Sequence, residues 1–227
     1  MNFCVVLLLL QDWSQFRGPA QGVSAEKSLP ASWSATEHVV WKTALPGPGT
    51  SSPILVGDKI FLTAYSGFNV PGEPGDMNAL KRHLVCLDRK SGKLLWKKDV
   101  EAKLPEQPKI RDEHGYASST PASDGKRIYC FFGKSGAKAF DLTGKELWTA
   151  DVGDALHGWG SAASPVLYEN TVLINASVES QSLVALDVAT GKEVWRARGI
   201  KESWNTPVLA KTELLLAIQG KILGLDP

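Results

Sequence analysis

The sequence predicts an all-β fold, a β-propeller built from four-stranded antiparallel blades. Three observations support this prediction: a strand–turn–strand segment occurs three times, a Ser/Thr-Pro dipeptide occurs four times at related positions, and the composition is rich in turn-forming residues. The chain has 227 residues, with 21 Gly, 13 Pro and 8 Trp but only 2 Met. Because Gly and Pro are typical of turns, many short strands are favoured and a helical bundle is disfavoured.

The repeated segment occupies residues 84–100, 137–153 and 183–199. Each copy has an alternating apolar run that ends in Asp, a polar turn with Gly, and then Lys, two further residues and Trp. An Asp carboxylate accepts N–H groups of a turn and Gly adopts a positive φ without a Cβ clash, so each copy predicts a β-hairpin. The hairpins carry Asp88, Gly92 and Trp96, then Asp141, Gly144 and Trp148, then Asp187, Gly191 and Trp195.

The Ser/Thr-Pro dipeptide marks the start of each structural unit. Each proline opens a short strand in which its missing N–H is tolerated. The last three of these four repeated prolines, Pro121, Pro165 and Pro207, are 44 and 42 residues apart, which is the period of a propeller blade. An insertion widens the first interval. The predicted units are three blades over 53–100, 121–153 and 165–199 and a partial blade over 207–227.

Residues 39–45 repeat only the second half of the hairpin segment. We therefore expect a lone outermost strand there, after an N-terminal extension over 12–38. Two arrangements are open. The strand completes the partial blade 207–227 and closes a four-bladed ring, or the chain is the first half of a seven- or eight-bladed propeller. In the second arrangement, open blade edges favour association with another molecule, including a second copy of the chain.

Four tryptophans, Trp41, Trp96, Trp148 and Trp195, occupy the same position of the repeat. Neighbouring blades must stack to keep their apolar faces out of water, and one Trp buries about 150–250 Å². We expect these side chains in the seams between blades, as structural residues, with a sugar-binding role as the alternative. The turn glycines assigned to the same structural role are Gly92, Gly144 and Gly191.

The N-terminus carries an unbroken apolar run, from Phe3 to Leu10, of the length found in signal peptides and too short to cross a bilayer. It predicts a truncated signal segment over 1–11 and a periplasmic or other extracytoplasmic location, with a buried first strand as the alternative. Cys86 and Cys130 lie in apolar stretches, so we expect buried, unreactive thiols. No Cys/His spacing indicates a metal site, and no metal ligand is assigned.

The charge balance limits the partners of the chain. With 25 basic and 24 acidic residues the formal net charge is +1, which disfavours binding to nucleic acid or to an anionic membrane. Hydrophobic residues make up 43% and charged residues 22%, values that exclude a disordered chain and a multi-span membrane protein. We expect no transmembrane span.

The candidate binding face carries the longest connections, over 67–83 and 101–118. In a propeller the connections between blades and the loops between the two middle strands emerge on one face, and long loops on a rigid scaffold are where binding resides. Histidines and aromatic residues recur before the prolines and could hold a planar ligand by stacking and hydrogen bonding. Alternatively, they turn the chain and cap the core. These residues are His114, Tyr116, His157, Trp159, Trp204 and Asn205.

The pattern Ala-x-Asp-x-x-Thr-Gly-Lys-x-x-Trp is complete over 185–195 and resembles the tryptophan-docking motif of the pyrroloquinoline quinone (PQQ) dehydrogenase-like propellers. The opening over 12–19, with 29–34, is similar to the start of exported bacterial PQQ-like repeat proteins. The resemblance covers nearly the whole chain. That superfamily holds quinone-dependent dehydrogenases and also non-catalytic scaffolds such as the outer-membrane-protein assembly lipoprotein, so the fold alone does not decide the function.

The resemblance implies one of two functions. The chain lacks the adjacent cysteine pair that quinone dehydrogenases commonly carry, and we assign no catalytic residue. We therefore expect a non-catalytic exported scaffold without a cofactor, which binds a protein or a small molecule at the loop-rich face. The alternative is a PQQ-dependent or degenerate oxidoreductase whose chain is incomplete, with PQQ and calcium as cofactors.

Overall fold

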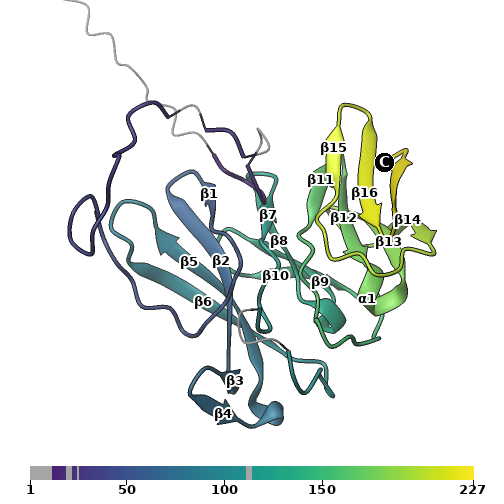
Figure 1. Cartoon of the computed structure of the whole chain (residues 1–227), viewed down its shortest axis with the longest axis horizontal. Coiled ribbons are helices and arrows are strands. Elements are labelled where there is room, and N and C mark those ends of the chain that lie inside the picture. Colours follow the sequence, from purple (N-terminus) through teal and green to yellow (C-terminus); the bar gives the residue numbers. More distant parts are fainter. Residues whose placement is uncertain (1–11, 19–21, 25, 111–113) are drawn as a thin grey trace, which may run out of the picture.

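The computed structural model describes residues 12–18, 22–24, 26–110 and 114–227, and the expected signal segment over 1–11 lies outside them. Three four-stranded antiparallel sheets and one three-stranded sheet follow one another along the chain and stand side by side (Figure 1). Each sheet is one blade, numbered 1 to 4 in chain order. The predicted all-β fold with about four propeller blades is confirmed. No helix in the described part of the chain is long and apolar enough to cross a membrane.

The first strand of every blade begins at the residue after one of the four repeated prolines, as the pattern predicts. Blade 1 has the order β1 (Ile54–Val56), β2 (Lys59–Ser66), β5 (Lys81–Asp88) and β6 (Leu94–Glu101). Blade 2 has the order β7 (Ala122–Ser123), β8 (Arg127–Phe131), β9 (Ala137–Asp141) and β10 (Glu146–Ala150). Blade 3 has the order β11 (Val166–Tyr168), β12 (Thr171–Ala176), β13 (Ser182–Asp187) and β14 (Glu193–Arg198). Blade 4 has the order β15 (Val208–Ala210), β16 (Glu213–Ile218) and β17 (Lys221–Leu225).

The connections between the two middle strands carry the remaining regular structure, at the lower side of Figure 1. The insertion in blade 1 forms a small hairpin of β3 (Phe68–Val70) and β4 (Glu73–Gly75), followed by the 3-10 helix η1 (Met77–Ala79). Blade 2 has the 3-10 helix η2 (Gly133–Ser135) at this place, and blade 3 has the single-turn helix α1 (Ser177–Ser180).

The prediction of a strand over residues 39–45 is wrong, because this segment pairs with no strand among the residues that the structure describes. The sheet of blade 4 has three strands and does not include it. Instead, Trp41 packs on blade 1, where its indole Nε1 donates a hydrogen bond of 3.3 Å to the Arg89 carbonyl. A segment forms a strand only when its backbone groups find a neighbouring ladder, and this one lies across a blade face. The closed four-bladed ring is therefore not formed.

The connection expected over 67–83 ends earlier, because β5 begins at Lys81. His83 is a buried strand residue and does not belong to the loop. Its ring Nε2 lies 2.8 Å from Ser66 Oγ and its Nδ1 lies 2.9 Å from Asp99 Oδ1, so the side chain ties three neighbouring strands together. Burial lowers the pKa of His83, although the hydrogen bond with Asp99 opposes this effect.

Apolar residues fill the seams between successive blades. Phe61 and Leu84 of blade 1 meet Phe140 of blade 2 in one cluster, and equivalent clusters join blade 2 to blade 3 and blade 3 to blade 4. Both cysteines, Cys86 and Cys130, are buried in the first seam and unpaired, as predicted. Burial raises the pKa of both thiols, that of Cys86 to about 12, which keeps them in the unreactive thiol form.

In each of the three hairpins the repeated tryptophan lies opposite a small residue of the neighbouring strand, and the register shifts there. The ring of Trp148 covers the turn of blade 3, where a Cβ added to Gly191 (φ +70°) would lie 2.6 Å from it. Its Nε1 donates a hydrogen bond of 3.0 Å to the Val188 carbonyl. The contact is repeated between Trp41 and Gly92 and between Trp96 and Gly144. A tryptophan of one segment therefore packs on the turn glycine of the following blade.

Candidate binding pocket

A pocket opens where two connections between blades pass over the ends of blades 1 to 3. Lining residues from 106–110 and 115–119 belong to the connection from blade 1 to blade 2, and those from 155–161 to the connection from blade 2 to blade 3. We call this cavity the crossing pocket. Its volume of about 30 Å³ has room for one or two molecules of the size of water. The charged side chains that line it are Arg82, Glu106, Lys134 and Glu179, with His157 beside them.

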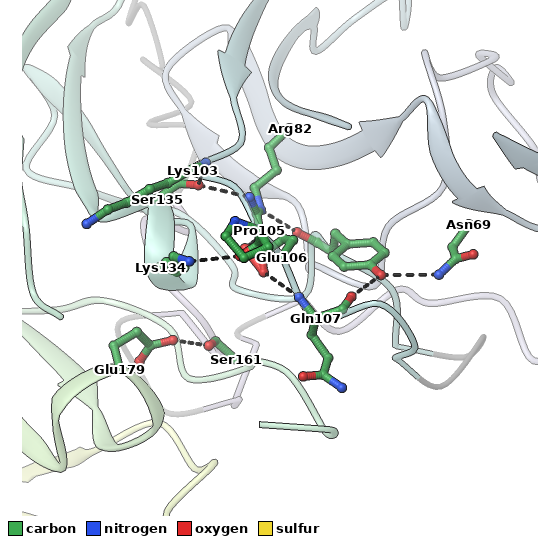
Figure 2. Close-up of polar contacts among 11 residues, drawn as sticks. Asn69, Arg82, Lys103, Pro105, Glu106, Gln107, Lys134, Ser135, Ser161 and Glu179 are labelled. Carbon is green, nitrogen blue, oxygen red and sulfur yellow. Dashed lines mark hydrogen bonds and ion pairs between the residues drawn. The ribbon is translucent and has the colours of Figure 1, made fainter. Parts of the chain in front are cut away.

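One wall of the crossing pocket is a buried ion pair. Arg82 of β5 donates from Nη2 to Glu106 Oε1 at 2.6 Å, and both residues are 4% exposed (Figure 2). The same guanidinium donates from Nε to the Tyr116 carbonyl and from Nη1 to Ser135 Oγ, at 3.0 Å each. Because a buried charge is tolerated only when it is paired and hydrogen-bonded, this network fixes the connection against blades 1 and 2.

Blade 2 holds the same connection through η2. Lys134 Nζ donates to the Pro105 carbonyl at 2.8 Å, and the backbone N–H of Lys103 donates to Ser135 Oγ at 3.0 Å. Lys103 also forms an ion pair of 2.8 Å with Asp151, at the start of the next connection. These contacts join two successive connections into one rigid surface.

Glu179 of α1 forms the opposite wall. It is 3% exposed, and its Oε1 accepts a hydrogen bond from Ser161 Oγ, as Figure 2 shows. Its Oε2 has no hydrogen-bond partner among the described residues, and neither has the buried Ser119 Oγ, which also lines the pocket. Burial raises the pKa of Glu179 to about 7, and the Ser161 hydrogen bond only partly opposes this. The lining residues of the pocket thus include two buried polar atoms without a partner in the described part of the chain.

An aromatic cluster lies beside the mouth of the pocket. The ring of Trp204 lies 5.0 Å from that of His157 and 5.3 Å from that of Trp159, measured between centroids. Trp204 Nε1 donates to the Gly160 carbonyl at 2.9 Å, and the Trp159 N–H donates to His157 Nδ1 at 3.2 Å. Trp159 is 57% exposed. We call His157, Trp159 and Trp204 the aromatic rim.

The structure separates the other predicted site residues. His114 lies beside the rim, with Nδ1 close to Ser118 Oγ, and burial lowers its pKa. Tyr116 is a core residue: it is buried against Tyr65 and donates its hydroxyl to the Gln107 carbonyl at 2.6 Å. Asn205 donates to the Ala217 carbonyl at 2.6 Å and so attaches its connection to β16.

Sequence reasoning missed the charged residues of the crossing pocket. Arg82, Glu106 and Glu179 recur in no repeat position and match no motif. The signal that could have found them is a charged residue beside an apolar run, as in the segment over 81–87. Their burial follows from the meeting of connections that are far apart in sequence.

A larger hollow of about 750 Å³ lies between the segment over 15–18 and the inner strands of blades 3 and 4. Its volume is that of a cofactor site. PQQ is a planar tricarboxylate, and calcium needs six to eight oxygen ligands, several of them carboxylates. Arg17 is the one charged residue in the lining, and no group of three potential metal ligands occurs among the described residues. The residues described here therefore do not fit PQQ with calcium.

Comparison with known proteins identifies a family and solved structures that are similar to this chain. Residues 77–221 match the family described as outer membrane protein assembly factor BamB. No individually curated protein matches the sequence. The crystal structure of BamB from Moraxella catarrhalis is 20% identical, with a TM-score of 0.51 over 75% of this chain and 43% of that one. The chain therefore spans less than half the length of that protein.

Two other solved structures share the fold. The computationally designed Ika4 protein is 15% identical, with a TM-score of 0.51 over 81% of this chain and 95% of that one. Quinohemoprotein alcohol dehydrogenase ADHIIG from Pseudomonas putida HK5 is 17% identical, with a TM-score of 0.50 over 78% of this chain and 29% of that one. At these identities the structures show the fold alone. Because the family match covers well over half of the chain, the protein belongs to the BamB family of PQQ-like β-propeller repeat proteins.

Proposed function

We propose that the protein is a non-catalytic, exported scaffold that binds a protein partner during the assembly of outer membrane proteins. Its family is named for that process, and the BamB structure of Moraxella catarrhalis has the same fold. The family name also supports a periplasmic or outer-membrane-associated location. The observation that carries the proposal is the aromatic rim, which presents exposed tryptophan on a fixed backbone.

Large aromatic side chains supply much of the binding energy in protein interfaces, and Trp is among the residues enriched at their energetic centres. Trp159 is 57% exposed, and the neighbouring Leu156 is also exposed. An apolar group that remains in water on a folded chain gains free energy when a partner covers it. The aromatic rim therefore has the composition of an interface centre.

The backbone that carries the rim is held from two sides. The Ala155 N–H donates to the Glu179 carbonyl at 3.1 Å, and Trp204 reaches the Gly160 carbonyl from the next connection. A surface that is already ordered loses little conformational entropy when it binds. This preorganisation supports a docking role for the connection over 155–161.

The pocket chemistry supports a scaffold over an oxidoreductase. The larger hollow offers one cationic residue and no carboxylate, so its lining matches neither the charge of PQQ nor the ligands of calcium. We accordingly propose no cofactor for the described part of the chain.

The test is a photocrosslink from position 159 in the cells that make the protein. The full chain carries a photoreactive phenylalanine at Trp159 or, as the matched control, at Trp33, which is 59% exposed in the N-terminal extension. We expect position 159 to capture a component of outer membrane protein assembly and Trp33 to capture much less of it. Equal capture from both positions, or none from position 159, would refute the docking role. Fractionation of the same cells tests export.

A further inference from the structure

We infer that the crossing pocket binds the ammonium group of a lysine side chain presented by the partner, with Glu179 as the counter-ion. The inference rests on the proposed function, because it names the chemistry of the partner at the same face. Its first support is an unfinished hydrogen-bond network: Glu179 and Ser119 both line the pocket, and their buried atoms Oε2 and Oγ have no partner among the described residues. A buried polar atom without a partner costs free energy that a ligand can recover.

The charge of the ligand follows from the neighbours of Glu179. Arg82 of β5 is already paired with Glu106 at 2.6 Å. Lys134 of η2 donates to the Pro105 carbonyl, and no ion pair in the described chain involves Glu179. His157 lies at the mouth on the second connection. Among the described residues, Glu179 is therefore a carboxylate of the pocket without an ion pair, and a cationic donor satisfies both its charge and its free oxygen.

The size of the cavity selects the kind of cation. A volume of about 30 Å³ has room for one or two groups of the size of water, so it admits a compact ammonium group more readily than a planar guanidinium. The methylene stem of a lysine would then leave the pocket past the aromatic rim. Of the rim, His157 lines the pocket, and Trp204 and then Trp159 follow it through ring contacts. A methylene stem packs on such ring surfaces, and a cation is stabilised near them.

Binding of this kind has a predictable dependence on pH. Burial raises the pKa of Glu179 to about 7, so the carboxyl is largely neutral at pH 6 and largely ionised at pH 8. An ammonium group binds the ionised form and displaces the proton. The ionised fraction rises by about tenfold over this range, and the affinity for lysine should rise by the same factor. The other charged side chains that line the pocket are Arg82 of β5, Glu106 of the first connection and Lys134 of η2, and His157 of the second connection lies beside them.

The experiment uses the full chain with 15N-labelled tryptophan and follows the indole resonances of Trp159 and Trp204 by NMR. The probes are Nα-acetyl-lysine methylamide and its uncharged counterpart, Nα-acetyl-norleucine methylamide. We expect saturable shifts with the lysine probe, none with norleucine, and binding about tenfold tighter at pH 8 than at pH 6. Glu179→Gln should abolish the lysine response, while Glu146→Gln, an exposed change on β10, should leave it unchanged.

Equal shifts from both probes would overturn the inference, because the rim would then bind without the carboxylate. No shift from either probe would overturn it as well, because the cavity would then hold only water. Both results come from the unchanged protein and do not depend on whether Glu179→Gln folds. Photocrosslinking from position 159 that persists after such a result would leave the proposed scaffold function standing and remove the lysine site alone.

Discussion

Replacing Glu179 with Gln should change the way in which folding stability depends on pH. The carboxyl has an ordinary pKa of 4.5 in the unfolded chain, and burial raises the pKa to about 7 in the folded protein. Between these values the folded state keeps a proton that the unfolded state has released. The free energy of unfolding of the wild type should therefore fall as the pH rises from about 4.5 through about 7. At about 1.4 kcal/mol per pH unit, this difference corresponds to a loss of about 3 kcal/mol.

The amide of the Gln variant has a similar shape and does not titrate, so the variant lacks this loss. Urea denaturation of both proteins from about pH 5 to about pH 8 gives the difference in the free energy of unfolding directly. Relative to the wild type, Glu179→Gln should gain about 2–3 kcal/mol over this range, with contributions from other titrating groups cancelling in the comparison. Glu146→Gln on the exposed side of β10 is the control. If the free energies of unfolding of the wild type and of Glu179→Gln changed in parallel with pH, the conclusion that burial raises the pKa of Glu179 would be refuted.

Three further substitutions and one ligand test probe the rest of the account. Trp148→Ala should lower the free energy of unfolding by about 3–5 kcal/mol, because the ring fills the seam between blades 2 and 3. Replacing the exposed Trp33 with Ala should change it by about 0.5 kcal/mol or less. Equal effects of the two substitutions in urea denaturation would contradict the role of Trp148 in the seam. Arg82→Met should lower the free energy of unfolding by about 3–5 kcal/mol, because it leaves the buried Glu106 carboxylate without its counter-ion, and adding Glu106→Leu should recover most of that loss. A double variant as unstable as the single one would contradict the role given to the ion pair. Burial lowers the pKa of His83, so as the pH drops below 6.5 the unfolded chain binds a proton before the folded protein does, and the free energy of unfolding should fall in this range. His83→Gln should reduce this fall. An unchanged dependence of the free energy of unfolding on pH would show that His83 is not the group responsible. PQQ with calcium should leave the melting temperature unchanged, and an increase measured by calorimetry would reinstate the cofactor reading.

The blades could be predicted from the sequence because local chemistry determines their limits. Each repeated proline stands just before the first strand of a blade. In each hairpin the N–H of the turn glycine donates to the carbonyl of the Asp that begins the turn. The lone strand over 39–45 could not be judged in the same way. Its hydrophobic pattern matches the other copies, but a strand also needs a neighbouring ladder, and that depends on the arrangement of the whole chain.

The candidate site was predictable only in part. His157, Trp159 and Trp204 all lie in the connections that precede successive repeated prolines, so the repeat brings them to the same end of neighbouring blades. Tyr116 holds a similar place but is buried, because the insertion in blade 1 provides Phe68 to pack against it. The charged walls of the crossing pocket join residues far apart in sequence. Neither periodicity nor composition carries information on such contacts.

The central claim is that the aromatic rim is where the protein holds its partner, and the most direct test is the affinity of the purified complex. Once the partner captured from position 159 is known, its dissociation constant is measured for the wild type, Trp159→Ala and Trp33→Ala. The rim predicts a loss of about 2 kcal/mol, or about 30-fold, for Trp159→Ala and no change for Trp33→Ala. Equal affinities for all three proteins would contradict the account.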